Sequence, residues 1–433
     1  MSPVQVGLLG IVLLLLLLFS RIWIGVAMAL VGFLGFAYLG SLEGALSLLK
    51  VVPLRFIADY TLSVIPLFIL MGVVTYEAGI SEDLYRTAHK WLGQQPGGLA
   101  VATIGACAAF SATCGSSTAC AVIMSKIALP EMKKYNYDTR LAAGTVAAGG
   151  TLGILIPPSL GFILYAILTE RSVGMLFMAG IFPGLLLATL FSISIILITR
   201  RNEQLNLRQP KITFKEKIIS LKHTGPMLAL FFLVIGGLYM GVFTPGEAGA
   251  IGAFGAIVIG IARKKLSYRK FLAALVETGQ TTCMMLFLLL GAMIFMRFMA
   301  ISNLPFALAA LLEEIQMSRY FVLAVMLFIY ILLGMFLDII SSQILTIPII
   351  FPVVLAMNFD PIWFGVLMIV IQEMGLITPP IGLNVFMVSG ASDVPVGTIF
   401  AGVWPFVIAM AICIILIILF PLIALFLPNT MRV

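Results

Sequence analysis

The sequence has little charge and almost no histidine. Charged side chains make up 10% of its 433 residues, and only two histidines are present. An average soluble protein carries more than twice that share of charge. Both histidines, His89 and His223, lie in charged stretches that we expect to be loops, away from the cysteines, so no zinc or haem site can be assembled from them.

Cysteine is scarce as well. The five cysteines all lie in apolar segments and none shows CxxC spacing: Cys107, Cys114, Cys120, Cys283 and Cys413. We interpret them as small buried hydrophobic residues rather than as metal ligands or disulfide partners.

Two catalytic signatures are absent. The chain has no GxxxxGK[ST] motif, which argues against an ATPase. Ser116 has no histidine near it in the sequence, so an intramembrane hydrolase would lack its general base. We therefore expect neither enzymatic activity nor an organic cofactor.

Hydrophobic residues, in contrast, make up 62% of the chain. About 20 consecutive apolar residues suffice to cross a bilayer, and this chain offers many such runs. We predict an all-α polytopic membrane protein in contact with lipid. The first apolar run, VGLLGIVLLLLLLF, has no basic residue before it and no small-residue cleavage site after it, so we expect a retained first helix.

Basic residues exceed acidic ones, 25 to 18. In a soluble protein this excess would suggest a nucleic-acid partner. In a membrane protein, basic residues collect in cytoplasmic loops, so we interpret the excess as a topology signal and expect no nucleic-acid partner.

The sequence repeats itself at an offset of 222 residues. Every proline between positions 130 and 183 falls on another proline at this offset: Pro130 on Pro352, Pro157 on Pro379, Pro158 on Pro380 and Pro183 on Pro405. Gly153 also falls on Gly375. We therefore predict two homologous halves, residues 1–199 and 223–433, joined by a polar cytoplasmic linker at 200–222.

The two halves are expected to have opposite orientations. In the first half we place crossings at about 4–20, 22–40, 56–80, 141–168 and 175–199. Five crossings are an odd number, so the second copy must be inverted. The charges agree: Lys126, Lys133 and Lys134 have no basic counterpart in 346–362. Both termini are then predicted to be periplasmic.

Residues 99–130 have polar or basic residues at both ends, so a single crossing does not suit them. We predict a re-entrant helical hairpin that enters from the cytoplasm and turns between Ser111 and Thr118, within ATCGSSTA. Irregular backbone at this depth is tolerated only where protein or a wet cavity covers it. The second half offers a counterpart at 320–354, with its tip in LDIISSQ.

A double proline follows each hairpin, within predicted broken helices at 141–168 and 361–390. Proline lacks an N–H and frees the carbonyl four residues earlier. The freed carbonyls are predicted at Gly153 and Ile154, and at Gly375 and Leu376. Unwound carbonyls beside a serine-rich turn suit a hard cation such as Na⁺, so two such clusters predict two cation sites.

A structural alternative exists for each motif. A proline in a membrane helix often marks a simple kink, and a serine pair is often a helix-packing contact. The recurrence of both motifs in both halves favours function.

The ordered set of motifs resembles a known family. The inverted repeat, the ATCGSSTA and DIISSQ tips, the two Pro-Pro breaks and VFTPGEAGAIGA at 242–253 together resemble the large membrane subunit of tripartite ATP-independent periplasmic (TRAP) transporters, the DctM-like family. Many members read TPTEA where this chain has TPGEA.

The resemblance implies an elevator-type, Na⁺-driven importer of a small organic anion in the bacterial inner membrane. A scaffold stays fixed while a transport domain carries both hairpins. The implied partners are a periplasmic substrate-binding protein (DctP-like) and a separate small four-helix membrane subunit (DctQ-like).

Two Na⁺ sites follow from the resemblance by position. The first is expected near Cys114 and Ser116, with carbonyls of Gly153, Ile156 and Pro158. The second is expected near Ser341 and Ser342, with Gly375 and Thr378.

Candidate substrate-binding residues are Asp338, Arg297, Ser116 and Asn384. Asp338 is an intramembrane charge, which is costly unless it faces a cavity or a partner. Its structural alternative is a helix cap or a pair with Arg297, and Arg297 itself could simply reach the outer interface. Glu247 is expected to be a first-turn residue of a helix, and the role of Glu373 stays open.

The competing interpretation is a stand-alone sodium- or proton-coupled dicarboxylate permease with the same two hairpins, which would take up substrate without a binding protein. A channel would need a continuous polar lining, which the two separate polar clusters do not supply. The anion itself is not identified by the sequence.

Overall fold

The computed structural model describes residues 1–201, 212–314 and 317–431, and every regular element in these ranges is a helix. The helices of the first half are α1 Pro3–Phe19, α2 Ile24–Leu39, α3 Leu42–Ile57, the short 3-10 helix η1 Tyr60–Ser63, α4 Val64–Glu77, α5 Ile80–Leu92, α6 Gly98–Cys114, α7 Ser117–Lys134, α8 Thr139–Leu155, α9 Leu160–Thr169 and α10 Val173–Arg201. Those of the second half are α11 Phe214–Tyr239, α12 Pro245–Ala262, α13 Tyr268–Ser302, α14 Leu304–Glu314, α15 Arg319–Phe336, α16 Ile339–Ala356, α17 Pro361–Gly375, α18 Leu383–Ala391, α19 Val396–Leu419 and α20 Leu422–Thr430.

Eight of these helices, or nine if the bent pair α8–α9 forms one span, are long and apolar enough to cross a membrane. Their outward faces carry large hydrophobic side chains, as lipid contact requires. The chain is therefore a multi-pass helical membrane protein, as its composition predicts.

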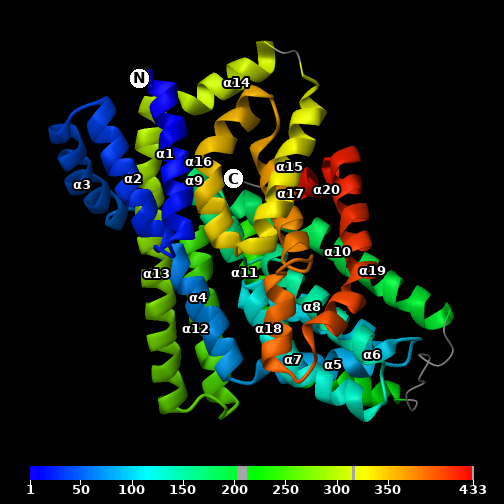
Figure 1. Cartoon of the computed structure of the whole chain (residues 1–433). Coiled ribbons are helices and arrows are strands. Elements are labelled where there is room, and N and C mark those ends of the chain that lie inside the picture. Colours follow the sequence, from blue (N-terminus) through cyan, green and yellow to red (C-terminus); the bar gives the residue numbers. More distant parts are fainter. Residues whose placement is uncertain (202–211, 315–316, 432–433) are drawn as a thin grey trace.

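The helices form two groups that lie side by side (Figure 1). In one group α2 packs along α13 and α4 along α12. In the other, α8 and α17 are the innermost helices: every residue from Leu141 to Leu155, and from Ile362 to Gly375, is buried. A helix buried on all sides belongs at the centre of a membrane protein, so α8 and α17 lie in the core of this group. The first Pro-Pro break is buried with them, whereas Pro380 at the second break is exposed.

The two helical hairpins lie at opposite ends of the molecule. Figure 1 shows α6 and α7 at the lower end and α15 and α16 at the upper end. The short helices that precede them, α5 and α14, are separated in the same way.

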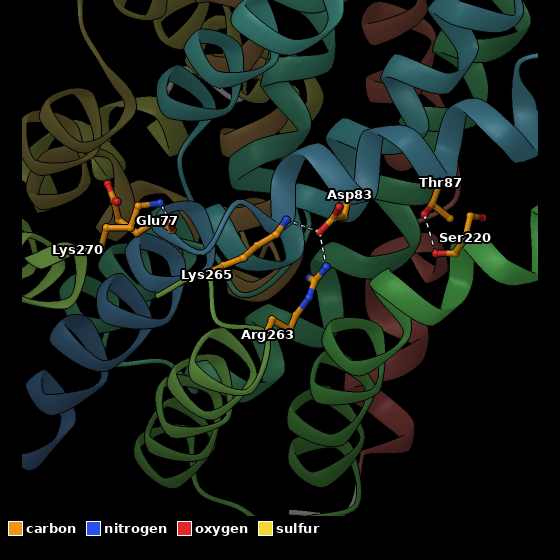
Figure 2. A network of polar contacts seen from close by, with 7 residues as sticks. All are labelled: Glu77, Asp83, Thr87, Ser220, Arg263, Lys265 and Lys270. Atoms are coloured by element: carbon orange, nitrogen blue, oxygen red, sulfur yellow. Dashed lines mark hydrogen bonds and ion pairs between the residues drawn. The ribbon is translucent and has the colours of Figure 1, made fainter. Parts of the chain in front are cut away.

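An ion-pair network fixes α5 to the group that contains α2, α4, α12 and α13 (Figure 2). Asp83 accepts hydrogen bonds from Arg263 and Lys265 in the turn between α12 and α13. Burial alone would raise the pKa of the Asp83 carboxyl, but the hydrogen bonds from Lys265 and Arg263 outweigh it and hold that pKa below its usual value. Thr87 donates to the Ser220 carbonyl of α11 at 3.2 Å, which extends the contact along α5.

Several sequence predictions need correction here. The stretch 200–222 is only partly a linker, because α10 extends to Arg201 and α11 begins at Phe214; residues 202–211 lie outside the described part. His89 and His223 lie in helices rather than loops. Cys283 is exposed on α13, since an apolar side chain in a membrane protein can face lipid, and α20 is an additional C-terminal helix.

Candidate functional site

The first hairpin tip is a two-residue turn. Gly115 adopts a left-handed conformation with a φ of 63°, which ends α6 at Cys114. Ser116 is the N-cap of α7, and its hydroxyl accepts a hydrogen bond from the Ala119 N–H at 3.4 Å. The turn is shorter than the predicted Ser111–Thr118 because a left-handed glycine reverses the chain at once.

This tip meets the first Pro-Pro loop. The Leu160 N–H donates to the Gly115 carbonyl at 3.3 Å. A Cβ atom at Gly153 would lie 2.6 Å from the Ser116 carbonyl oxygen, and one at Gly115 would lie 3.2 Å from that of Pro158. Glycine at both positions therefore lets two unwound segments approach closely.

Every residue assigned to the first cation site lies in or next to this junction. The Cys114 thiol donates to the Ser116 carbonyl at 3.5 Å. Ile156 caps the C-terminus of α8 in an extended conformation, two residues before Pro158. Pro157 and Pro158 have no N–H to offer the carbonyls of Gly153 and Ile154, so oxygen ligands are concentrated here.

The second hairpin tip carries a carboxylate. Asp338 is the N-cap of α16 and accepts from the Ser341 N–H at 3.4 Å, which is the capping role considered as its alternative. Ser342 is buried, and its hydroxyl accepts from the Gln372 amide at 3.0 Å. The Gly382 N–H donates to the Met335 carbonyl at 3.3 Å, so this tip also meets its Pro-Pro loop.

The prediction of unpaired carbonyls at Gly375 and Leu376 is wrong. The Thr378 N–H donates to the Gly375 carbonyl, and the Asn384 N–H to that of Leu376, both at 3.0 Å. The chain leaves α17 through a tight turn whose bonds span three residues instead of four, so the missing proline donors are replaced. Each carbonyl keeps a second lone pair with which it could contact an ion.

Unpartnered polar side chains lie on α16, α17 and α18, the helices that adjoin the second hairpin tip and the second break. In the described residues, both amide atoms of Gln343 and of Asn384 and both carboxylate oxygens of Glu373 are buried and make no hydrogen bond. The hydroxyl of Ser117, in the first turn of α7, lies near the Glu373 carboxyl. Buried polar groups without partners are rare in native proteins and mark places where something else binds. In the sequence, only the short polar motifs SSQ and IQE within apolar runs indicate that Gln343 and Gln372 are unusual.

Arg297 does not join either tip. It lies exposed on α13, makes no ion pair with Asp338, and lines a cavity of about 530 Å³ beside α2 and α3. Glu247 completes the N-terminal cap of α12, accepting from the Thr244 N–H at 2.8 Å, as expected.

The sequence comparisons with known proteins agree on one family. Residues 11–423 match the family described as "Tripartite ATP-independent periplasmic transporter, DctM component". The chain is 34% identical over 371 residues to the C4-dicarboxylate TRAP transporter large permease protein DctM of Pseudomonas aeruginosa, covering 86% of each. It is 31% identical over 374 residues to the sialic acid TRAP transporter large permease protein SiaM of Vibrio cholerae, covering 86% of this chain and 87% of that one.

A solved structure shares the fold. The YdaH transporter of Alcanivorax borkumensis superimposes with a TM-score of 0.69 at 16% identity, covering 94% of this chain and 97% of that one. The family match covers residues 11–423, and the identity to a curated large permease is 34% over 86% of the chain. The chain therefore belongs to the DctM family of TRAP transporter large permeases.

Proposed function

We propose that this chain is the translocating subunit of a Na⁺-coupled TRAP importer for a small organic anion, working by an elevator mechanism in the bacterial inner membrane. The observation that carries the proposal is the junction of each hairpin tip with its Pro-Pro loop, at Gly115–Leu160 and at Met335–Gly382. Each junction gathers helix ends and backbone oxygens, which can bind and release an ion.

The inverted repeat is supported by the element bounds. α7 and α16 both have 18 residues, and their bounds differ by the same 222 residues that align the prolines. The matched hairpins lie at opposite ends of the molecule (Figure 1). Opposite placement of equivalent elements is what an inversion requires, with both termini on the periplasmic side.

An elevator is supported by the division into two groups of helices. The group of α2, α4, α12 and α13 is the proposed scaffold, and the group that contains both hairpins and both broken helices is the proposed transport domain. α5 connects the two, and the Asp83 network fixes it to the scaffold. Movement of the transport domain would then begin beyond α5, at the glycine-rich turn of residues 93–97.

The residues at the first tip fit a Na⁺ ion. Ser116 supplies a hydroxyl oxygen, and Gly153, Ile156 and Pro158 supply carbonyls, without a full negative charge. The second site would use Ser341, Ser342, Gly375 and Thr378, where the carbonyl of Gly375 offers its second lone pair. Asp338, Ser116 and Asn384 remain the proposed contacts of the anion near the tips.

Partners follow from the family. We propose that a periplasmic binding protein delivers the anion and that a separate small membrane subunit binds alongside. The substrates named for relatives, C4-dicarboxylates and sialic acid, are both organic anions.

The first test is thermal unfolding of the purified chain in detergent, titrated with NaCl or KCl at constant ionic strength. An ion that binds the folded state stabilises it by RT ln(1 + [L]/Kd), so we expect a saturable shift with Na⁺ only. Ser116→Leu and Ser342→Leu should each weaken the shift, whereas Ser194→Leu on α10 should not. Equal responses to both salts would refute Na⁺ coupling.

The second test is uptake into proteoliposomes. We expect uptake only when the binding protein, the small subunit and an inward Na⁺ gradient are all present. Uptake by this chain alone would instead support the stand-alone permease.

A further inference from the structure

A cavity of about 530 Å³ lies between the two groups of helices, and no residue of either hairpin tip lines it. Its walls come from α2, α3, η1 and α13 on one side and from the end of α9 on the other. A second cavity of about 190 Å³ shares Glu170 and Arg297 with it. Arg297 lies near the end of α13 that is opposite the Asp83 network, so the proposed topology places the cavity on the periplasmic side.

Two arginines line this cavity without partners. Within the described residues, neither Arg55 nor Arg297 forms an ion pair or a hydrogen bond. The wall around them is apolar, with Phe36, Phe56 and Met293 among its members. Both arginine side chains are exposed, so an anion can reach them, and a guanidinium binds a carboxylate or sulfonate with paired N–H groups.

Two carboxylates line the same cavity and do not neutralise the arginines. Asp59 already accepts a hydrogen bond from the Thr61 N–H at 2.9 Å. Glu170 contributes to both cavities but makes no ion pair in the part of the chain that the structure describes, and the neighbouring Arg171 lies over the Phe351 ring at 5.9 Å. Glu170 is therefore a free hydrogen-bond acceptor opposite two free donors.

We propose that this cavity is an outer binding site for a hydroxylated organic acid. Arg55 and Arg297 bind the acid group, while Glu170 accepts hydrogen bonds from the hydroxyls. The volume falls within the usual range for small-molecule sites. A dicarboxylate fits less well, because its second negative charge would face Glu170. The proposal rests on the proposed function in one respect, that the chain imports an organic anion.

The position of the site suggests what it does. It lies where the end of α9, in the proposed transport domain, faces the scaffold helix α13. An anion bound there would occupy an initial binding site beside the moving domain, from which it would pass to a hairpin tip. Arg297 would thus act in substrate capture on the scaffold, apart from Asp338.

The test is ligand-dependent thermal unfolding of the full chain in detergent at fixed Na⁺. The probes are gluconate, N-acetylneuraminate and isethionate, each an acid with hydroxyls, together with succinate and neutral sorbitol. We expect saturable stabilisation by at least one hydroxylated acid, weaker stabilisation by succinate and none by sorbitol.

Variants locate the site. Arg55→Gln and Arg297→Gln should each weaken binding about tenfold, as expected for loss of a charge-assisted hydrogen bond. Arg319→Gln is the matched control, because Arg319 stacks on Tyr320 outside the cavity. Arg297→Lys keeps the charge and should give an intermediate affinity. Glu170→Gln should shift the preference towards succinate.

The outcomes separate this inference from the proposed function. No stabilisation by any acid, or equal affinities for Arg297→Gln and Arg319→Gln, would overturn the outer site. A preference for succinate in the unsubstituted chain would overturn the assigned ligand class. If Na⁺ gives no specific stabilisation but the hydroxylated acids still bind through Arg55 and Arg297, the coupling proposal fails and the outer site stands.

Discussion

Equivalent positions around the two Pro-Pro loops carry different chemistry. At the 222-residue offset, the first region has Ser116, Ala121, Gly150, Thr151 and Phe162 where the second has Asp338, Gln343, Gln372, Glu373 and Asn384. The backbone plan is shared, since both tips bond to their loops. The first region thus offers backbone oxygens in tight packing, whereas the second offers polar side chains without partners. Under the proposed function, the first region would form an ion site from main-chain oxygens, and the second would form a site that discriminates between ligands.

The largest effect is expected where the backbone plan itself is broken. A Cβ at Gly153 would lie 2.6 Å from a backbone oxygen, and one at Gly375 would lie 2.7 Å from the Gly334 carbonyl carbon. Gly153→Ala and Gly375→Ala should each lower the free energy of unfolding by about 1–3 kcal/mol, because backbone atoms cannot move aside cheaply. Thermal unfolding in detergent measures the change.

Gly236→Ala is the matched control for this prediction. Nothing lies within 4 Å of a Cβ at Gly236, so alanine there should be neutral or stabilise α11 by up to about 1 kcal/mol. If Gly153→Ala were as stable as this control, the close approach of tip and loop would be refuted.

The next largest effect concerns the one side-chain bond between the second tip and its broken helix. Ser342→Ala removes the only hydrogen-bond partner that the described residues offer the buried Gln372 amide, and it should cost about 1–3 kcal/mol. Gln372→Met should cost a similar amount. The double variant should cost clearly less than the sum of the two, since no polar group is then left stranded. Additive losses would show that the two side chains do not interact.

Sequence reasoning located the local features and missed those that depend on distant contacts. The Pro-Pro breaks, both hairpin tips and the Glu247 cap are local, because proline, glycine and capping residues act within a few positions. The bonds of Gly375 and Leu376 depend on how the chain continues into α18, which a lone Pro-Pro motif does not reveal. Asp83 and Arg263 are 180 residues apart, and Arg55, Glu170 and Arg297 come from three separate elements. Such groupings are fixed only by tertiary packing.

A third prediction compares two equivalent residues that should respond with opposite signs. Glu373→Gln should stabilise the protein in KCl by about 1 kcal/mol, because it removes a buried carboxylate that forms no ion pair with any described residue. Thr151→Ala should destabilise by about 1 kcal/mol, because the Thr151 hydroxyl donates to the Ala148 carbonyl at 2.6 Å. Unfolding in KCl excludes any contribution from Na⁺. A loss of stability in Glu373→Gln would mean that the carboxylate holds a structural contact.

The smallest effect is expected at the two short helices that precede the hairpins. Asp83 holds α5 to the α12–α13 turn by two ion pairs (Figure 2). The equivalent position in α14 is Pro305, whose side chain carries no charge and can form no ion pair. Asp83→Asn should lower the free energy of unfolding by about 1 kcal/mol, as a partly buried ion pair suggests. Glu82→Gln, at the exposed neighbouring position, should change nothing measurable.

The pH dependence gives the sign of this last effect. Because the pKa of Asp83 is lower in the folded protein than in the unfolded chain, the ion pairs stabilise the protein fully above the ordinary aspartate pKa. That stabilisation is lost as the pH falls through the folded-state pKa, when the folded carboxyl takes up a proton. The unfolding temperatures of the unsubstituted chain and Asp83→Asn should therefore differ by a constant amount from pH 8 down to about pH 5 and converge below about pH 4. A difference that persists unchanged in acid would mean that asparagine disturbs the packing of α5, and that the charge of Asp83 is not what holds this helix to the scaffold.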